Sequence, residues 1–185
     1  MAKQERNVVT YGLSGKIGDL LVFRQKSGKT IVAKAPVRPG KASEKQTAHR
    51  QRFQQAVIYA KAAVASPLAG ELYQTAAKKG KQPFNVAVAD FFNAPDVHHI
   101  DFREYRGAVG DKTYITVSDD FAVRTVEVAI SNSDGSPVES GAAVQHDGRL
   151  WIYTATQDNA HTEGDKIVIT VSDLPGNVTA EEQAL

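Results

Sequence analysis

The feature that most constrains the fold is a change in the spacing of apolar residues near Asp101. Between about residues 43 and 92, apolar side chains recur every three or four positions, whereas beyond Asp101 they alternate with polar ones. The first spacing is typical of one face of a helix, and the second of one face of a strand. The sequence therefore predicts helices in the first part of the chain and β-structure in the second.

The second part of the chain contains four clear strand patterns. They lie at residues 113–117, 123–130, 149–156 and 166–171. The second pattern is the clearest, because Val126, Val128 and Ile130 occupy every other position. Turn-forming pairs separate the strands, and Asp134-Gly135 is a strong hairpin signal. Short alternating strands at this spacing predict a small antiparallel β-sandwich.

The first part of the chain predicts a β-hairpin followed by three helices. Two β-prone runs, residues 20–25 and 30–34, flank the turn sequence Lys26-Ser27-Gly28-Lys29. A capping box at Ser43 and Gln46 predicts the start of a helix that runs to about Ala65. Further helices are expected to begin at Ser66-Pro67 and at Pro83, since proline suits the first turn of a helix.

Apolar residues at helical spacing define the face that each helix is expected to bury. For the three helices in order these residues are Phe53, Ala56, Val57, Ala60 and Val64; Leu68, Leu72, Tyr73 and Ala76; and Phe84, Ala87, Val88 and Phe91. The predicted fold class is therefore α+β, with an N-terminal hairpin and about three helices in residues 1–100 and an antiparallel immunoglobulin-like sandwich in residues 101–185.

The net charge of +1 conceals a strong separation of charge along the chain. Residues 1–81 contain 16 Lys and Arg against 4 Asp and Glu, a balance of +12, whereas residues 82–185 contain 6 against 17, a balance of −11. Such asymmetry favours a polyanionic partner for the basic part or pairing of basic with acidic surfaces. It also fits two solvated surfaces that attract each other within one molecule.

Basic residues are the strongest functional signal in the sequence. Lys26 and Lys29 flank the tip of the expected hairpin, while Lys45 and Arg52 lie on one face of the first helix. These four residues are the predicted contacts to an anion or a partner. We expect a protein partner, which includes a second copy of this chain. The alternative is sequence-independent nucleic-acid binding, although no aromatic stacking platform or nucleic-acid fold signature accompanies the basic residues.

No complete catalytic, cofactor or metal motif is present in the sequence. Gly28-Lys29-Thr30 resembles the end of a phosphate-binding loop, but Phe23 stands where that loop requires glycine. His98-His99, with Asp96 and Asp101, is the one cluster of metal-ligand types that the sequence suggests. Adjacent residues of a strand point to opposite faces, so this cluster is predicted to be a polar linker. A non-enzymatic protein without a cofactor, metal site or catalytic residues is expected.

The composition also bears on location. The chain has no cysteine, which excludes disulfides and thiolate metal sites. No apolar run approaches the ~20 residues needed to span a bilayer, and residues 1–12 lack the apolar segment of a secretory signal. We expect a cytoplasmic protein without a membrane partner.

Two resemblances support this layout. The segment GDKTYITVSDDFAVRTVEVAISNSDGSPVESGAA, together with RLWIYTA and KIVITVSDLPGNVT, resembles bacterial immunoglobulin-like or fibronectin-like domains. The segments YGLSGKIGDLLVFRQKSGKTIVAKAPVRP and QTAHRQRFQQAVIYAK resemble a family of short bacterial proteins of uncharacterised function. The first resemblance implies a binding or spacer module, and the second implies the two-part layout without an activity.

Overall fold

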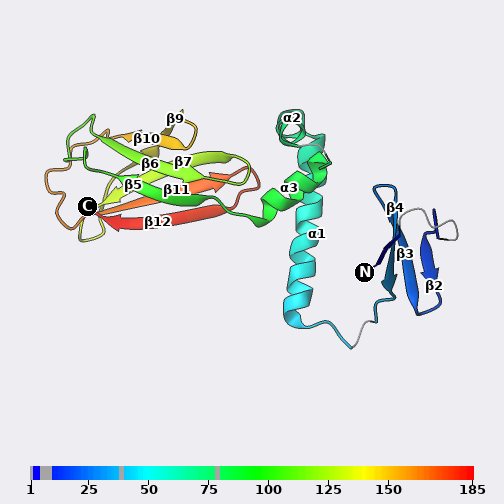
Figure 1. Cartoon of the computed structure of the whole chain (residues 1–185). Coiled ribbons are helices and arrows are strands. Elements are labelled where there is room, and N and C mark those ends of the chain that lie inside the picture. The colour runs from blue at the N-terminus through cyan, green and yellow to red at the C-terminus, as the bar shows by residue number, and fades with distance from the viewer. Residues whose placement is uncertain (1, 5–9, 38–39, 78–79) are drawn as a thin grey trace. The chain divides into compact units, whose positions relative to one another are not determined.

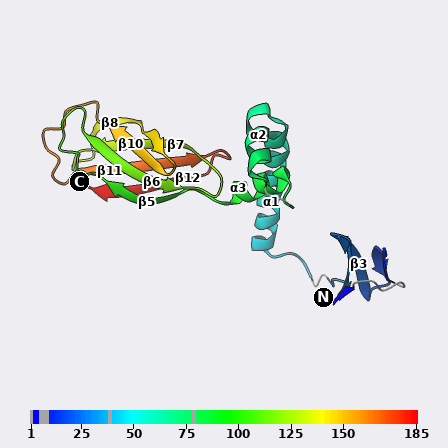
Figure 2. The same cartoon turned by 45° about the horizontal axis from the view of Figure 1, so that its top comes forward.

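The computed structural model describes residues 2–4, 10–37, 40–77 and 80–185 (Figures 1 and 2). The chain forms two compact units, residues 1–47 and 48–185. The predicted boundary at residue 100 differs from this division, because the three helices belong mainly to the second unit. The α+β class is confirmed, with an N-terminal hairpin, three helices and antiparallel sheets.

The first unit contains one antiparallel sheet in the order β1-β4-β3-β2. Its strands are β1 (Ala2–Gln4), β2 (Gly15–Ile17), β3 (Leu21–Lys26) and β4 (Lys29–Lys34). The predicted hairpin is formed by β3 and β4. Its two turn residues, Ser27 and Gly28, have φ values of 52° and 75°. A two-residue type I′ turn requires positive φ at both of these positions. Glycine accepts such a φ freely, and Ser27 adopts it against the usual preference.

The three helices are α1 (Glu44–Ala65), α2 (Pro67–Ala76) and α3 (Pro83–Phe92). The capping box is confirmed, because the backbone N–H of Gln46 donates to Ser43 Oγ at 3.2 Å and the backbone N–H of Ser43 donates to Gln46 Oε1 at 3.1 Å. None of the helices in the described ranges is both long and apolar enough to span a membrane.

The predicted buried faces of α1 and α2 are partly wrong. Phe53 is 48% exposed and Leu68 is 76% exposed, although both belong to the expected stripes. The residues that these two helices bury are mostly small, namely Ala56, Ala60, Ala63 and Gly70, together with Tyr73. Small side chains let neighbouring helices approach closely, so the contact is narrower than the apolar pattern suggests, and larger residues beside it remain exposed.

The β part forms two antiparallel four-stranded sheets, with the strand orders β5-β6-β10-β9 and β12-β11-β7-β8. The strands are β5 (Asp96–Asp101), β6 (Lys112–Ser118), β7 (Val123–Ser131), β8 (Pro137–Ala142), β9 (Val144–Asp147), β10 (Leu150–Thr154), β11 (Lys166–Asp173) and β12 (Val178–Ala184). The expected linker around His98 is in fact strand β5, which pairs with β6.

The order of the strands is that of an immunoglobulin-like sandwich. If β5, β6 and β7 are taken as strands A, B and C, the first sheet reads A-B-E-D and the second reads G-F-C with one additional strand beside C. In this topology the B–C and F–G connections lie at one end of the sandwich. Here these connections are residues 119–122 and 174–177.

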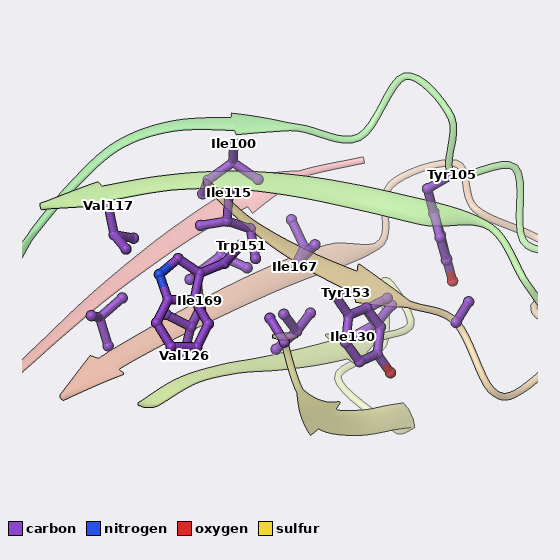
Figure 3. Close-up of a cluster of buried hydrophobic side chains, with 14 residues drawn as sticks. Ile100, Tyr105, Ile115, Val117, Val126, Ile130, Trp151, Tyr153, Ile167 and Ile169 are labelled. Atoms are coloured by element: carbon purple, nitrogen blue, oxygen red, sulfur yellow. The ribbon is translucent and has the colours of Figure 1, made fainter. Parts of the chain in front are cut away.

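Side chains from the facing surfaces of the two sheets fill the core of the sandwich (Figure 3). Its fully buried members include Ile115 from one sheet and Val128, Ile167 and Ile169 from the other. Trp151 comes from β10, which corresponds to strand E, whereas antibody domains place their buried tryptophan on strand C. The alternation that the sequence shows in these strands thus creates the apolar interior.

Candidate functional site

The first unit places a group of basic side chains on one face of its sheet. Residues directly opposite each other in an antiparallel pair share a face, and so do alternate residues of one strand. Lys16 lies opposite Val22, Arg24 lies opposite Ile31, and Lys26 lies opposite Lys29. Val22, Arg24 and Lys26 alternate along β3. Ala33 lies opposite Val22. The register therefore places all of these residues, including Ala33, on one face of the sheet.

This basic face has an apolar centre. Val22, Ile31 and Ala33 are half-buried, while Arg24 and Lys26 are exposed. At the hairpin tip, Lys26, Ser27, Lys29 and Ile31 line a shallow hollow of about 320 Å³. We call the set Lys16, Val22, Arg24, Lys26, Lys29, Ile31 and Ala33 the basic face. Two of the four predicted contact residues, Lys26 and Lys29, belong to it.

The other two predicted residues have different surroundings. Lys45 is exposed in the first turn of α1. Arg52 lies in the second unit, where its guanidinium carbon is 5.2 Å from the centre of the Phe92 ring and its Nη2 donates to the Phe92 carbonyl at 3.4 Å. His49 also stacks on Phe92, at 6.0 Å between ring centres. Arg52 therefore has a packing role between α1 and α3.

Three carboxylates meet at the B–C and F–G end of the sandwich. Asp90 lies in the last turn of α3, Asp119 in the β6–β7 connection, and Asp173 at the end of β11. One carboxylate oxygen of each residue lies within 4.8 Å of the other two. Within the described ranges of the chain, this is the one such group of three possible metal ligands. We call it the carboxylate cluster.

The strand register explains why the helix reaches this end of the sandwich. Asp96, the first residue of β5, pairs with Ser118, the last residue of β6. The helix α3 ends four positions before β5 begins. Because the start of β5 lies beside the end of β6, the end of α3 lies near the connection that follows β6 (Figure 1). Asn177 reinforces the junction, because its side-chain amide donates to the carbonyl of Asn93 at 2.9 Å and to Asp173 Oδ2 at 2.7 Å.

Loop amides hold two of the three carboxylates in place. Asp119 Oδ2 accepts hydrogen bonds from the amides of Phe121 at 3.1 Å and Ala122 at 2.9 Å. Asp173 Oδ1 accepts from the amides of Gly176 at 2.8 Å and Asn177 at 2.6 Å. These bonds are typical of aspartates that stabilise turns. They fix the position of each carboxylate independently of the other two.

Asp90 is held by two tyrosines from the other helices. The Tyr73 hydroxyl donates to Asp90 Oδ2, and the hydroxyl oxygens of Tyr59 and Tyr73 are 2.7 Å apart. Because Tyr73 uses its proton on Asp90, Tyr59 donates to Tyr73, and the chain of hydrogen bonds runs toward the carboxylate. The Tyr73 ring stacks on Phe121 at 4.4 Å between centres. One residue from each helix thus contributes to this network.

Burial and neighbouring charge raise the pKa of two residues of the cluster, Asp90 and Asp173. Burial raises the pKa of Asp90 to about 6, the hydrogen bond from Tyr73 opposes this change, and the charges of Asp119, Asp173 and Asp120 add to it. Burial likewise raises the pKa of Asp173, partly offset by hydrogen bonds from Asn177 and Gly176. None of the ion pairs formed between described residues involves the three carboxylates.

The histidine pair that the sequence suggested as a metal cluster is arranged differently. His98 and His99 lie in β5, where His98 Nε2 is 2.5 Å from Ser118 Oγ and both side chains are exposed. The carboxylate cluster was missed by the sequence analysis, because its members are separated by 29 and 54 positions. Knowledge of the strand order would have revealed it, since two of its members follow strands B and F of the predicted sandwich.

Comparison with known proteins adds no relative. No protein-family model, no curated protein and no solved structure matches the chain. The resemblance of the first part to a family of short bacterial proteins stays a prediction. The immunoglobulin-like arrangement rests on the strand order described above.

Proposed function

We propose that the protein is a non-enzymatic interaction protein that self-associates, with the basic face of one copy bound to the acidic sandwich of another. The observation that carries this proposal is the composition of the basic face, in which cationic side chains surround an apolar centre of Val22, Ile31 and Ala33. An apolar centre with a charged rim is the usual composition of a protein–protein interface.

The charge balance supplies the complementary surface. Residues 82–185 carry 17 acidic residues against 6 basic ones, and among them Glu127, Asp147 and Glu181 are exposed on strands of the sandwich. Charges of opposite sign on two surfaces accelerate encounter and select the partner more than they strengthen the final complex. The apolar centre would then supply the part of the affinity that does not depend on salt.

Sedimentation velocity of the full chain tests the proposal. We expect associated species at ~50 mM NaCl and a smaller associated fraction at ~500 mM, where the Debye length falls to about 4 Å and the charges are screened while the apolar contact remains. The double variant Arg24→Glu/Lys26→Glu should be monomeric at both salt concentrations. The variant Lys61→Glu reverses a charge on α1 and is the matched control. It should associate like the wild type, because Lys61 is exposed and lies outside the basic face. A wild-type chain that is monomeric at both concentrations contradicts self-association.

A further inference from the structure

We propose that the carboxylate cluster of Asp90, Asp119 and Asp173 is a binding site for Ca²⁺, which joins α3 to the B–C and F–G connections of the sandwich. This inference is independent of the proposed self-association, because it concerns different residues and a different ligand. Its basis is the geometry of the three carboxylates, their burial, and two oxygen atoms that have no partner among the described residues.

The first argument is the missing neutralisation of charge. Asp90 is 2% exposed and Asp173 is 0% exposed, and Asp119 is half-buried beside them. Buried carboxylates are normally paired with a cation or bound to a metal, since an isolated buried charge is very unfavourable. No ion pair between described residues reaches this cluster. A bound Ca²⁺ would offset two of the three negative charges that the fold brings together from three separate segments.

The second argument is independent of the charges and concerns individual atoms. Asp90 Oδ1 and Asp119 Oδ1 are both buried and make no hydrogen bond with any residue that the structure describes, whereas the second oxygen of each residue is engaged. In Asp90, Tyr73 takes Oδ2, so Oδ1 is the oxygen that remains available. Buried polar atoms are almost always satisfied in folded proteins, and an unsatisfied one calls for an explanation such as an ion.

The third argument identifies the cation by its bond lengths. Ca²⁺ binds oxygen ligands at about 2.3–2.6 Å, so ligands on opposite sides of the ion are about 4.6–5.2 Å apart. Mg²⁺ binds at about 2.0–2.1 Å and accommodates a separation of only about 4.2 Å. The oxygens of the cluster all lie within 4.8 Å of one another, a span that the ligands of one Ca²⁺ ion cover and that its flexible coordination accommodates. Three carboxylates form the anionic part of a calcium site, and water or carbonyl oxygens can complete its coordination.

Binding of Ca²⁺ should stabilise the second unit. Trp151 lies in the sandwich core and is the single tryptophan, so its fluorescence reports the melting of this unit. For a Kd on the order of 10 µM, 1 mM CaCl₂ should raise the Tm of the full chain by about 5–10 °C relative to the same buffer with EDTA. MgCl₂ at 1 mM should raise it by less.

Two matched variants locate the effect. Asp119→Asn removes one of the unpartnered carboxylate oxygens and retains an oxygen for the loop amides, and it should abolish the Ca²⁺-dependent change in Tm. Asp147→Asn removes an exposed carboxylate of β9 and should leave this change intact. An equal response of wild type and Asp119→Asn to Ca²⁺ would place the ion elsewhere and overturn the proposal.

Tb³⁺ luminescence provides a readout that does not depend on stability. Tb³⁺ accepts the same oxygen ligands as Ca²⁺ and is excited by energy transfer from a nearby phenol ring, which Tyr73 supplies through its contact with Asp90. We expect Tb³⁺ luminescence with the wild-type chain, and Ca²⁺ should displace the bound Tb³⁺ at a lower concentration than Mg²⁺ does. The luminescence intensity should be at least tenfold lower with Asp119→Asn. The alternative is a cluster neutralised by protons alone. In that case 1 mM Ca²⁺ leaves the Tm unchanged and Tb³⁺ gives no signal above that of Asp119→Asn, and the calcium site is refuted.

Discussion

The Tyr73 hydroxyl connects the packing of the helices to the chemistry of the carboxylate cluster. It donates to Asp90 and accepts from Tyr59, and Tyr73 itself is fully buried. A hydroxyl in this position fixes the orientation of the Asp90 carboxylate and leaves its other oxygen unengaged. The same side chain therefore holds three helices together and determines which oxygen is available to a cation.

Tyr73→Phe is expected to lower the free energy of unfolding by about 1–3 kcal/mol. The substitution keeps the ring against Phe121 but removes the one hydrogen bond that the described residues donate to Asp90 Oδ2, so that a buried acceptor loses its partner. Urea denaturation followed by Trp151 fluorescence measures the change.

Tyr114→Phe is the matched control for this prediction. Tyr114 also donates to a carboxylate, Glu104, at 2.9 Å, but that bond is exposed to solvent. Its loss should change the free energy of unfolding by less than about 0.5 kcal/mol. Equal effects of the two substitutions would show that the Tyr73 hydroxyl has no special role.

Sequence reasoning identified Tyr73 as buried but gave it no partner. Asp90 follows apolar positions in a short helix, Asp119 precedes a strand, and Asp173 precedes a Pro-Gly turn, so each is an ordinary residue in its local context. Only the strand order brings the three together, and strand order depends on contacts between distant segments. The basic residues were found because charge is visible in composition, whereas the face that they share depends on strand register.

At the scale of elements, the helices were predicted in the right places but with partly wrong faces. Caps and prolines are local signals, and they located the starts of α1, α2 and α3 to within a residue or two. The buried face depends on which side chains fit between neighbours. Ala56, Ala60 and Gly70 are small enough to allow close contact, whereas the more apolar Leu68 lies outside it. Strands β8, β9 and β12 were missed because most of their residues are exposed and lack alternation.

Gly70→Ala tests the importance of the close approach of α2 to the end of α1. A methyl group on Gly70 would lie 2.5 Å from the carbonyl oxygen of Val64, which belongs to the backbone and cannot move aside cheaply. We expect the free energy of unfolding to fall by about 1–3 kcal/mol, although alanine favours helices more than glycine does. Thermal and urea denaturation measure it.

Gln74→Ala, a change at an exposed position of the same helix, provides the comparison. It should alter the free energy of unfolding by no more than about 0.5 kcal/mol in either direction. If Gly70→Ala were instead stabilising, helix propensity would outweigh the contact, and the close approach of Gly70 to the end of α1 would not limit stability.

At the scale of the whole molecule, the separation of charge gives two competing expectations for the basic face. A polyanion such as duplex DNA would be held by the cations alone, and its affinity would fall steeply with salt. An acidic protein surface can also bury the apolar centre of the face, and that contribution persists when charges are screened. The two partners therefore respond differently to removal of an apolar side chain.

Ile31→Thr distinguishes them, because threonine retains the branched shape that suits a strand and leaves every charge of the basic face unchanged. If a second copy of the chain is the partner, the substitution should weaken self-association about tenfold or more at ~150 mM NaCl, since a half-buried isoleucine at the centre of the face is lost. Binding of a 20-base-pair DNA duplex, measured by fluorescence anisotropy at ~50 mM NaCl, should have the same affinity for the wild type and for Ile31→Thr. At ~150 mM NaCl neither chain should bind the duplex. A wild-type chain that binds the duplex at ~150 mM NaCl, with self-association unaffected by Ile31→Thr, would favour nucleic acid, because only cations would then account for both results.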